Sequence, residues 1–224
     1  MSLVTAILAL LACAPAGIPQ QPGRPGLTKV PASAVGQPTK LRVVNGSMSP
    51  EVLLLLIFDD SGSHAVRFPQ FAELALKANG ALGNDEYLAV ALVSNRARTL
   101  ISPRRRLTRR ELAKVLADAR HHLESADSKL DDGFVWAAQM QQRIQARRPV
   151  ILYHTDGEVT AGSNISRLNA ALRTLRNVNT YVYIVGVLPS HTDRMLGLFD
   201  KKQVYVGSDI PLSLILDSIR KAKP

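Results

Sequence analysis

Asp59, Ser61 and Ser63 offer oxygen atoms at alternating positions, directly after a strongly hydrophobic run from Leu53 to Phe58. The run is too short to cross a bilayer and too apolar for a strand with one face in water. It therefore indicates a central strand of a parallel sheet that is covered on both faces. Ligands of such sheets collect at the carboxyl ends of the strands. Because carboxylate and hydroxyl oxygens suit Mg²⁺, Mn²⁺ or Ca²⁺, these residues indicate a divalent-metal site.

The pattern Asp-x-Ser-x-Ser after a hydrophobic strand resembles the metal-ion-dependent adhesion site of von Willebrand factor type A (vWA) domains. That family places a Thr on a second loop and an Asp on a third. Ser128 stands where the Thr is expected and offers a hydroxyl without the methyl group. A second apolar strand ends in Thr-Asp-Gly, and its Asp156 matches the third loop. The resemblance implies that the metal is held by Asp59, Ser61, Ser63, Ser128 and Asp156.

Two other interpretations of the first loop remain open. An Asp at the end of a strand often caps the following helix, and Ser61 or Ser63 can do the same. Phosphatases of the haloacid dehalogenase type also end a hydrophobic strand in Asp-x-Asp and use Mg²⁺. In that chemistry the second Asp is a general acid and base, which requires a titratable group, but Ser61 stands at its position. The phosphatase interpretation is therefore the minor alternative.

Other polar and aromatic residues near these loops are given structural roles. We expect solvated or helix-capping carboxylates at Asp60, Asp131 and Asp132. Four of the five histidines lack metal-ligand spacing, and we interpret them as ordinary polar positions; they are His64, His121, His122 and His154. Trp136 is expected to pack in the core.

Strands and helices alternate along the chain from about residue 51. Strands are expected at 52–58, 87–93, 150–155, 181–187 and 203–206. Helices are expected around 71–78, from 108 to about 122, after 128, from a cap at Ser166, at 192–199 and after Pro211. This alternation predicts an α/β fold with a doubly wound, mostly parallel central sheet flanked by helices. The vWA resemblance adds one short antiparallel edge strand at Ala97–Ile101.

The first residues indicate export. Residues 3–12 have the length of a signal-peptide core rather than a membrane span. Leu10-Leu11-Ala12-Cys13 resembles a bacterial lipobox, in which Cys13 carries the lipid; ordinary signal-peptidase cleavage near 12–16 is the alternative. Residues 14–40 are rich in Pro, Gly and Gln and indicate a flexible linker. We thus divide the chain into a signal peptide with lipobox (1–13), a linker (14–40) and a vWA-like domain (41–224).

The chain is strongly basic, with a formal net charge of +10. Arginines cluster at 104–106, 109–110 and 147–148. A basic face would steer acidic partners towards the protein, although a merely solvated surface is an equal alternative. No aromatic stacking pattern accompanies these arginines, so we expect no nucleic-acid partner.

Together these features predict a binding protein rather than an enzyme. The vWA resemblance implies a metal-dependent adhesion or assembly module without catalysis, in which an Asp or Glu of a protein partner completes the shell of the Mg²⁺ (or Mn²⁺ or Ca²⁺) ion. The predicted lipobox places this module at a bacterial envelope, held by a lipid anchor in the membrane, or in the periplasm or outside the cell. The alternative is a vWA scaffold that binds through its arginine-rich face without metal.

Overall fold

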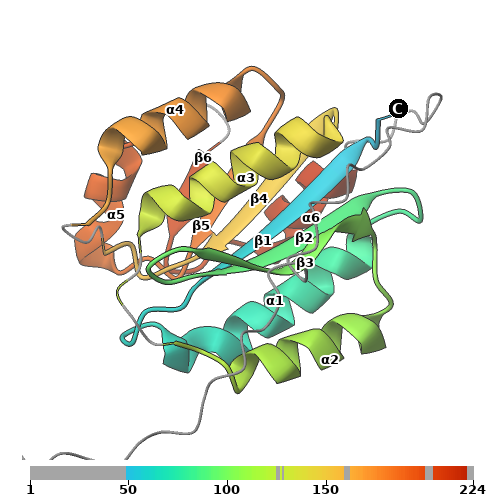
Figure 1. The fold of residues 1–224 in the computed structure, drawn as a ribbon, viewed down its shortest axis with the longest axis horizontal. Helices are drawn as coiled ribbons and strands as arrows, with labels where there is room; N and C mark the ends of the chain where they lie inside the picture. The colour runs from blue at the N-terminus through green and yellow to red at the C-terminus, as the bar shows by residue number, and fades with distance from the viewer. Residues whose placement is uncertain (1–48, 125–126, 128, 159–161, 200–203, 221–224) are drawn as a thin grey trace, which may run out of the picture. The chain divides into compact units, whose positions relative to one another are not determined.

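The computed structural model describes residues 49–124, 127, 129–158, 162–199 and 204–220. The predicted signal peptide, Cys13 and the linker lie outside these residues, as does Ser128. In the described part the chain forms one six-stranded sheet in the order β3-β2-β1-β4-β5-β6 (Figure 1). All neighbouring strands are parallel except β2 and β3, which are antiparallel. The predicted doubly wound α/β fold is thus confirmed.

The strands lie close to their predicted positions. They are β1 (Val52–Asp59), β2 (Tyr87–Val93), β3 (Ala97–Arg105), β4 (Arg148–His154), β5 (Tyr181–Val185) and β6 (Val204–Gly207). The edge strand β3 continues past its predicted end at Ile101, because its pairing with β2 extends to the partners Tyr87 and Arg105.

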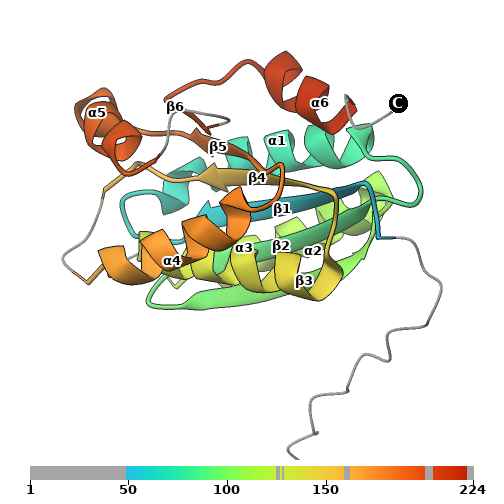
Figure 2. The same ribbon diagram turned by 90° about the horizontal axis from the view of Figure 1, so that it is seen from above.

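In the described residues six α-helices flank the sheet. They are α1 (Phe68–Ala81), α2 (Arg109–Arg120), α3 (Leu130–Ile144), α4 (Ile165–Arg176), α5 (Pro189–Gly197) and α6 (Leu212–Arg220), and a short 3-10 helix, Ala65–Arg67, precedes α1. Figure 2 shows α1 and α6 on one face of the sheet and α3 and α4 on the other. None of the helices in the described ranges is long and apolar enough to cross a bilayer.

Local sequence signals explain two helix starts. Thr108 and Glu111 form the predicted capping box of α2: the Glu111 backbone N–H donates to Thr108 Oγ1, and the Thr108 backbone N–H donates to the Glu111 carboxylate. The predicted cap of α4 at Ser166 is wrong. Asn164 caps this helix instead, because its side-chain oxygen accepts from the Arg167 backbone N–H at 3.1 Å. Asn is as good a cap as Ser, so the helix begins earlier.

Strand β1 joins the two hydrophobic layers of the domain. Leu54, Leu56 and Phe58 pack with α1, α2 and α6, whereas Leu53, Leu55 and Ile57 pack with α3 and α4. All of these side chains are fully buried. Burial of each contributes about 1.5–3 kcal/mol through the hydrophobic effect. This two-sided burial fixes the position of Asp59, the residue that ends the strand.

Truncating a buried side chain of β1 should therefore lower the stability of the protein. Leu55→Ala leaves a cavity in the buried core between β1 and the helices α3 and α4. We expect it to lower the free energy of unfolding by about 2–5 kcal/mol. Urea unfolding measures this change. The matched control is Val66→Ala, at a side chain that is 80% exposed, for which a change within about 0.5 kcal/mol is expected. Similar losses in both variants would contradict the two-layer core.

Candidate metal centre

The Asp59 carboxylate joins the loop after β1 to the loop after β4. One oxygen, Oδ1, accepts a hydrogen bond from the Ser61 backbone N–H at 2.9 Å. The other, Oδ2, accepts from Thr155 Oγ1 at 2.6 Å. The residue is only 2% exposed. Burial raises the pKa of the Asp59 carboxyl above its ordinary value, although the hydrogen bonds from Thr155 and Ser61 act in the opposite direction.

The other described candidates lie beside this carboxylate. Ser63 Oγ donates to Asp156 Oδ2 at 2.8 Å, and the hydroxyls of Ser61 and Ser63 are 3.4 Å apart. The remaining oxygen of Asp156 accepts from the Glu158 backbone N–H at 3.0 Å. The structure therefore brings together Asp59, Ser61, Ser63 and Asp156, which come from two loops far apart in the sequence.

Ser128 lies outside the described residues, but both ends of its loop are fixed at this edge of the sheet. The Glu124 backbone N–H donates to Asp60 Oδ2 at 2.8 Å, next to the first loop. The Lys129 backbone N–H donates to the Ser94 carbonyl at 3.2 Å, at the end of β2. The second predicted metal loop therefore starts and ends beside the first.

Thr155 is a site residue for which we predicted no role from the sequence. Its hydroxyl donates to Asp59 and accepts from the Gly157 backbone N–H at 3.1 Å. Gly157 has φ of 81°, and a Cβ atom there would lie 2.7 Å from Val187 Cγ1. Only glycine fits this left-handed turn without a clash. The Thr-Asp-Gly sequence thus sets the direction of the Asp156 side chain.

Two of the three aspartates that we predicted to be solvated or helix-capping carboxylates are instead buried. Asp60 is 1% exposed and lies 3.9 Å from Arg98 Nη2. Asp131 is fully buried, 3.0 Å from Arg167 Nη1, and accepts from the Asn164 backbone N–H. Both carboxylates anchor loops at this edge, because a buried charge needs paired partners. Asp132 pairs with the same arginine at 2.8 Å.

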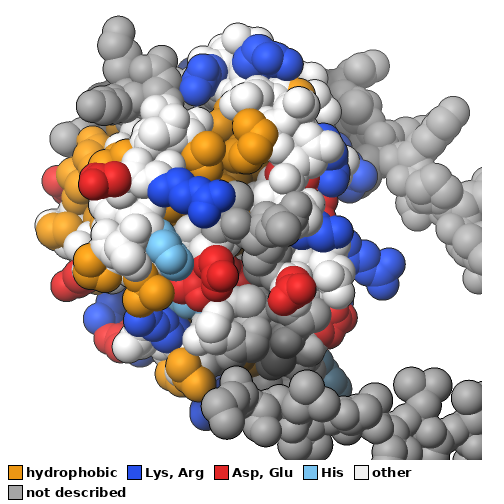
Figure 3. Space-filling view, turned by 90° about the vertical axis from the view of Figure 1, so that its left-hand side faces the viewer, with side chains coloured by type: hydrophobic (Ala, Val, Ile, Leu, Met, Phe, Trp, Pro, Cys, Tyr) orange, Lys and Arg blue, Asp and Glu red, His pale blue; other side chains and the backbone are white. Residues whose placement is uncertain are grey.

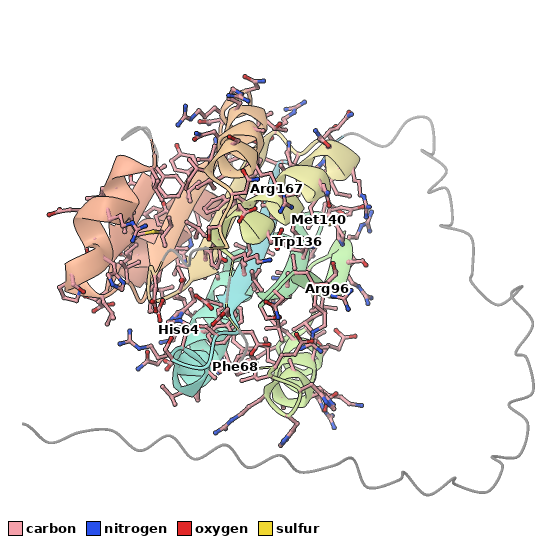
Figure 4. The ribbon with its side chains drawn as sticks, turned by 60° about the vertical axis from the view of Figure 1, so that its left-hand side comes forward. His64, Phe68, Arg96, Trp136, Met140 and Arg167 are labelled. Carbon is pink, nitrogen blue, oxygen red and sulfur yellow. The ribbon has the colours of Figure 1, made fainter. Side chains whose placement is uncertain are left out.

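Two histidines behind the site also differ from their prediction as ordinary polar positions. His64 and His154 are 0% and 3% exposed, and His64 Nε2 lies 2.6 Å from His154 Nδ1. Figure 4 shows His64 beside Phe68 at the start of α1. Gly186, with φ of 89°, lies against both rings, and a Cβ there would be 2.9 Å from His154 Cε1. Alternation along β4 places His154 on the same buried face as Leu152, a signal present in the sequence.

The donor set fits a hard cation. The described residues contain no group of three or more His, Cys, Asp or Glu side chains arranged to hold a metal. The cluster consists instead of two carboxylates and the serine hydroxyls. Mg²⁺, Mn²⁺ and Ca²⁺ prefer such oxygen ligands to sulfur or imidazole ligands. Figure 3 looks onto this edge and shows acidic side chains near its middle, with Lys and Arg side chains around them.

The sequence matches no protein-family model and no curated protein. Solved structures match over most of the chain. An aerotolerance-related membrane protein from Bacteroides fragilis superposes with a TM-score of 0.57 at 16% identity, covering 76% of this chain and 98% of that one. A von Willebrand factor type A protein from Catenulispora acidiphila gives a TM-score of 0.54 at 16% identity, covering 78% and 42%. The fold is that of vWA domains.

A third similar structure bears on the site. It is proximal thread matrix protein 1 from the mussel byssus, whose metal-ion-dependent adhesion site is occupied by zinc. Its TM-score is 0.52 at 13% identity, and the match covers 79% of this chain and 47% of that one. This chain therefore spans less than half of that protein. At such identities the comparisons establish the shared fold alone.

The buried histidines should make the stability of the protein depend on pH. Burial lowers the pKa of His64 to about 4 and that of His154 to about 3, whereas both titrate near pH 6.5 in the unfolded chain. Below pH 6.5 the unfolded chain takes up protons that the folded protein does not. The free energy of unfolding should therefore fall from about pH 6.5 towards pH 4, by up to about 1.4 kcal/mol per pH unit for each histidine.

Urea unfolding at several pH values measures this slope. The variant His64→Gln should show a shallower slope than the wild type, whatever its absolute stability. The matched control is His122→Gln, at an exposed histidine after α2, and it should keep the wild-type slope. Equal slopes in the two variants would contradict a neutral, buried histidine pair.

Proposed function

We propose that this domain is a metal-dependent protein-binding module. The proposal assigns a divalent cation, Mg²⁺, Mn²⁺ or Ca²⁺, to the side chains of Asp59, Ser61, Ser63, Ser128 and Asp156. The observation that carries it is the convergence of two loops: Ser63 Oγ lies 2.8 Å from Asp156 Oδ2, and Thr155 Oγ1 lies 2.6 Å from Asp59 Oδ2. The vWA fold supports a role in protein interaction at the level of the family.

The proposed donor set explains why the partner would supply an acidic residue. Mg²⁺ prefers six oxygen ligands and usually keeps several waters. Hydroxyl ligands are neutral, so a cation held partly by serines keeps its attraction for another carboxylate. An Asp or Glu of the partner would displace one water and complete the shell. The proposal requires no proton transfer and no covalent step, and it assigns no catalysis to the domain.

The proposed location is a bacterial envelope. This part of the proposal is supported by the lipobox-like sequence before Cys13 and by the similar fold of a membrane protein from Bacteroides fragilis. In this arrangement the linker of residues 14–40 separates the domain from a lipid anchor. The carboxyl edge of the sheet would then be presented to a protein partner.

Calorimetric titration with Mg²⁺ and Mn²⁺ tests the metal site. The wild-type protein should bind one ion with saturation, and Asp59→Ala should abolish binding because it removes a carboxylate at the centre of both loops. The matched control is Asp193→Ala, at an exposed carboxylate on α5, and it should bind as the wild type does. Wild-type protein without saturable binding would refute the proposal and favour a metal-independent scaffold.

The open coordination position can be tested separately. Water-proton relaxation reports how many waters the bound Mn²⁺ exchanges with solvent. Adding a soluble carboxylate, such as N-acetylglutamate, should lower the relaxation enhancement because it replaces a bound water. N-acetylglutamine, which has nearly the same shape and no charge, serves as the control. An unchanged enhancement with the carboxylate would contradict capture of an acidic side chain.

A further inference from the structure

The end of the sheet opposite the candidate metal centre carries most of the clustered arginines. We call this end the amino edge, because β1, β2 and β4 begin there. The pairing register places Arg105 level with Tyr87, Tyr87 with Leu53, and Arg148 with Val52. In Figure 1 this edge lies on the right, where β1 begins. The arginine surface at this edge is defined by Arg104, Arg105, Arg106, Arg109, Arg110 and Arg147.

The charge of the arginine surface is only weakly neutralised. All six side chains are exposed. Arg105 and Asp85 are 3.6 Å apart, with side chains 70% and 88% exposed, and Arg147 and Glu51 are 3.7 Å apart. Ion pairs at the surface have a small interaction free energy and are screened by salt. Neither Arg109 nor Arg110 forms a salt bridge with any carboxylate in the part of the chain that the structure describes.

Helix stability does not explain two of these arginines. Arg109 and Arg110 occupy the first turn of α2, directly after its cap Thr108. Unpaired N–H groups give this end of a helix a partial positive charge, so cations there are unfavourable and anions are favourable. An anionic ligand would remove this unfavourable interaction. The position of the two arginines thus indicates a surface that binds an anionic ligand.

The chain enters the domain at this same edge. The backbone N–H groups of Arg147 and Arg148 donate to the carbonyls of Pro50 and Glu51, at 3.1 and 2.9 Å. Residues 1–48, which precede this point, contain Arg24, Lys29, Lys40 and Arg42 and no Asp or Glu. The first described residues of the domain therefore lie at the edge that carries the arginines.

We propose that the arginine surface binds the anionic phospholipid headgroups of a membrane. Guanidinium groups match phosphate geometry, and each basic side chain near an anionic leaflet adds to the attraction. The eight residues of β1 span roughly 26 Å. A domain seated on its amino edge would therefore hold the carboxyl edge, with the candidate metal centre, about that far from the headgroups. This orientation does not depend on whether the centre binds metal.

A nucleic acid is the other polyanion that such a surface could meet, and the structure favours the membrane. Binding to single strands uses exposed aromatic rings among the basic side chains. Among the described residues the large exposed hydrophobic side chains are Val66, Ile165, Leu188 and Tyr205, and none belongs to the elements that carry the arginine surface.

Vesicle sedimentation tests the proposal with the full chain, carrying Cys13→Ser so that no lipid can be attached there. Vesicles of phosphatidylcholine with phosphatidylglycerol are compared with phosphatidylcholine alone. The test variant is Arg104→Glu with Arg109→Glu and Arg110→Glu. The control makes the same charge change away from the amino edge: Arg96→Glu, Arg120→Glu and Arg194→Glu, all at exposed positions. Thermal unfolding of both variants checks their folding.

We expect the wild type to bind only the vesicles with phosphatidylglycerol, and less tightly as salt increases. The test variant should lose affinity by about fivefold for each arginine, more than about 100-fold together. Its melting temperature should not fall, because acids suit the first turn of α2. The control should keep wild-type binding. The proposal would be overturned if the wild type bound both kinds of vesicle equally, or if both variants lost the same affinity. It would also be overturned if the wild type bound duplex DNA or RNA more tightly than the anionic vesicles.

Discussion

The hydrogen bonds to the buried Asp59 carboxylate hold the candidate site together. Thr155 Oγ1 and the Ser61 backbone N–H each satisfy one of its oxygens, and so the loops after β1 and β4 are fixed to one side chain. Burial raises the pKa of this carboxyl, which means that burial disfavours its ionised form. A bound cation would remove that penalty, because it neutralises the charge where water cannot. The burial that disfavours the ionised carboxylate would thus favour a bound cation.

The two-sided burial of β1 makes this arrangement possible. A strand covered by helices on both faces cannot slide or tilt without disrupting two hydrophobic layers, so its last residue has a fixed position. The parallel register then brings the ends of β2, β4 and β5 to the same edge, where short loops can approach one another. The opposite edge receives the strand starts and the arginine surface. One rigid sheet therefore presents carboxylate oxygens at one end and arginine side chains at the other.

Many of the strands and helix starts could be predicted from the sequence, because hydrophobic runs and capping signals are local. The run before Asp59 indicated the central strand, and Thr108 with Glu111 indicated the start of α2. The contacts of polar side chains were harder to predict because they depend on tertiary packing. His64 and His154 are 90 residues apart, and no local pattern indicates that their rings meet. Asp60 and Asp131 resemble surface carboxylates in sequence. Their burial is tolerable because distant residues pair with them: Glu124 and Arg98 with Asp60, and Asn164 and Arg167 with Asp131. Ser166 and Asn164 are both good caps, so sequence alone could not decide between them.

In the proposed site the clustered oxygens hold one divalent cation. The most direct test is a crystal structure of the protein grown with Mn²⁺, using anomalous scattering to locate the metal. We expect one strong peak between the loops after β1 and β4, within about 2.0–2.4 Å of the hydroxyl oxygens of Ser61 and Ser63, with the Ser128 hydroxyl in the same shell. A peak elsewhere, or no peak at saturating Mn²⁺ with Ser63 still bonded to Asp156, would contradict the proposed site.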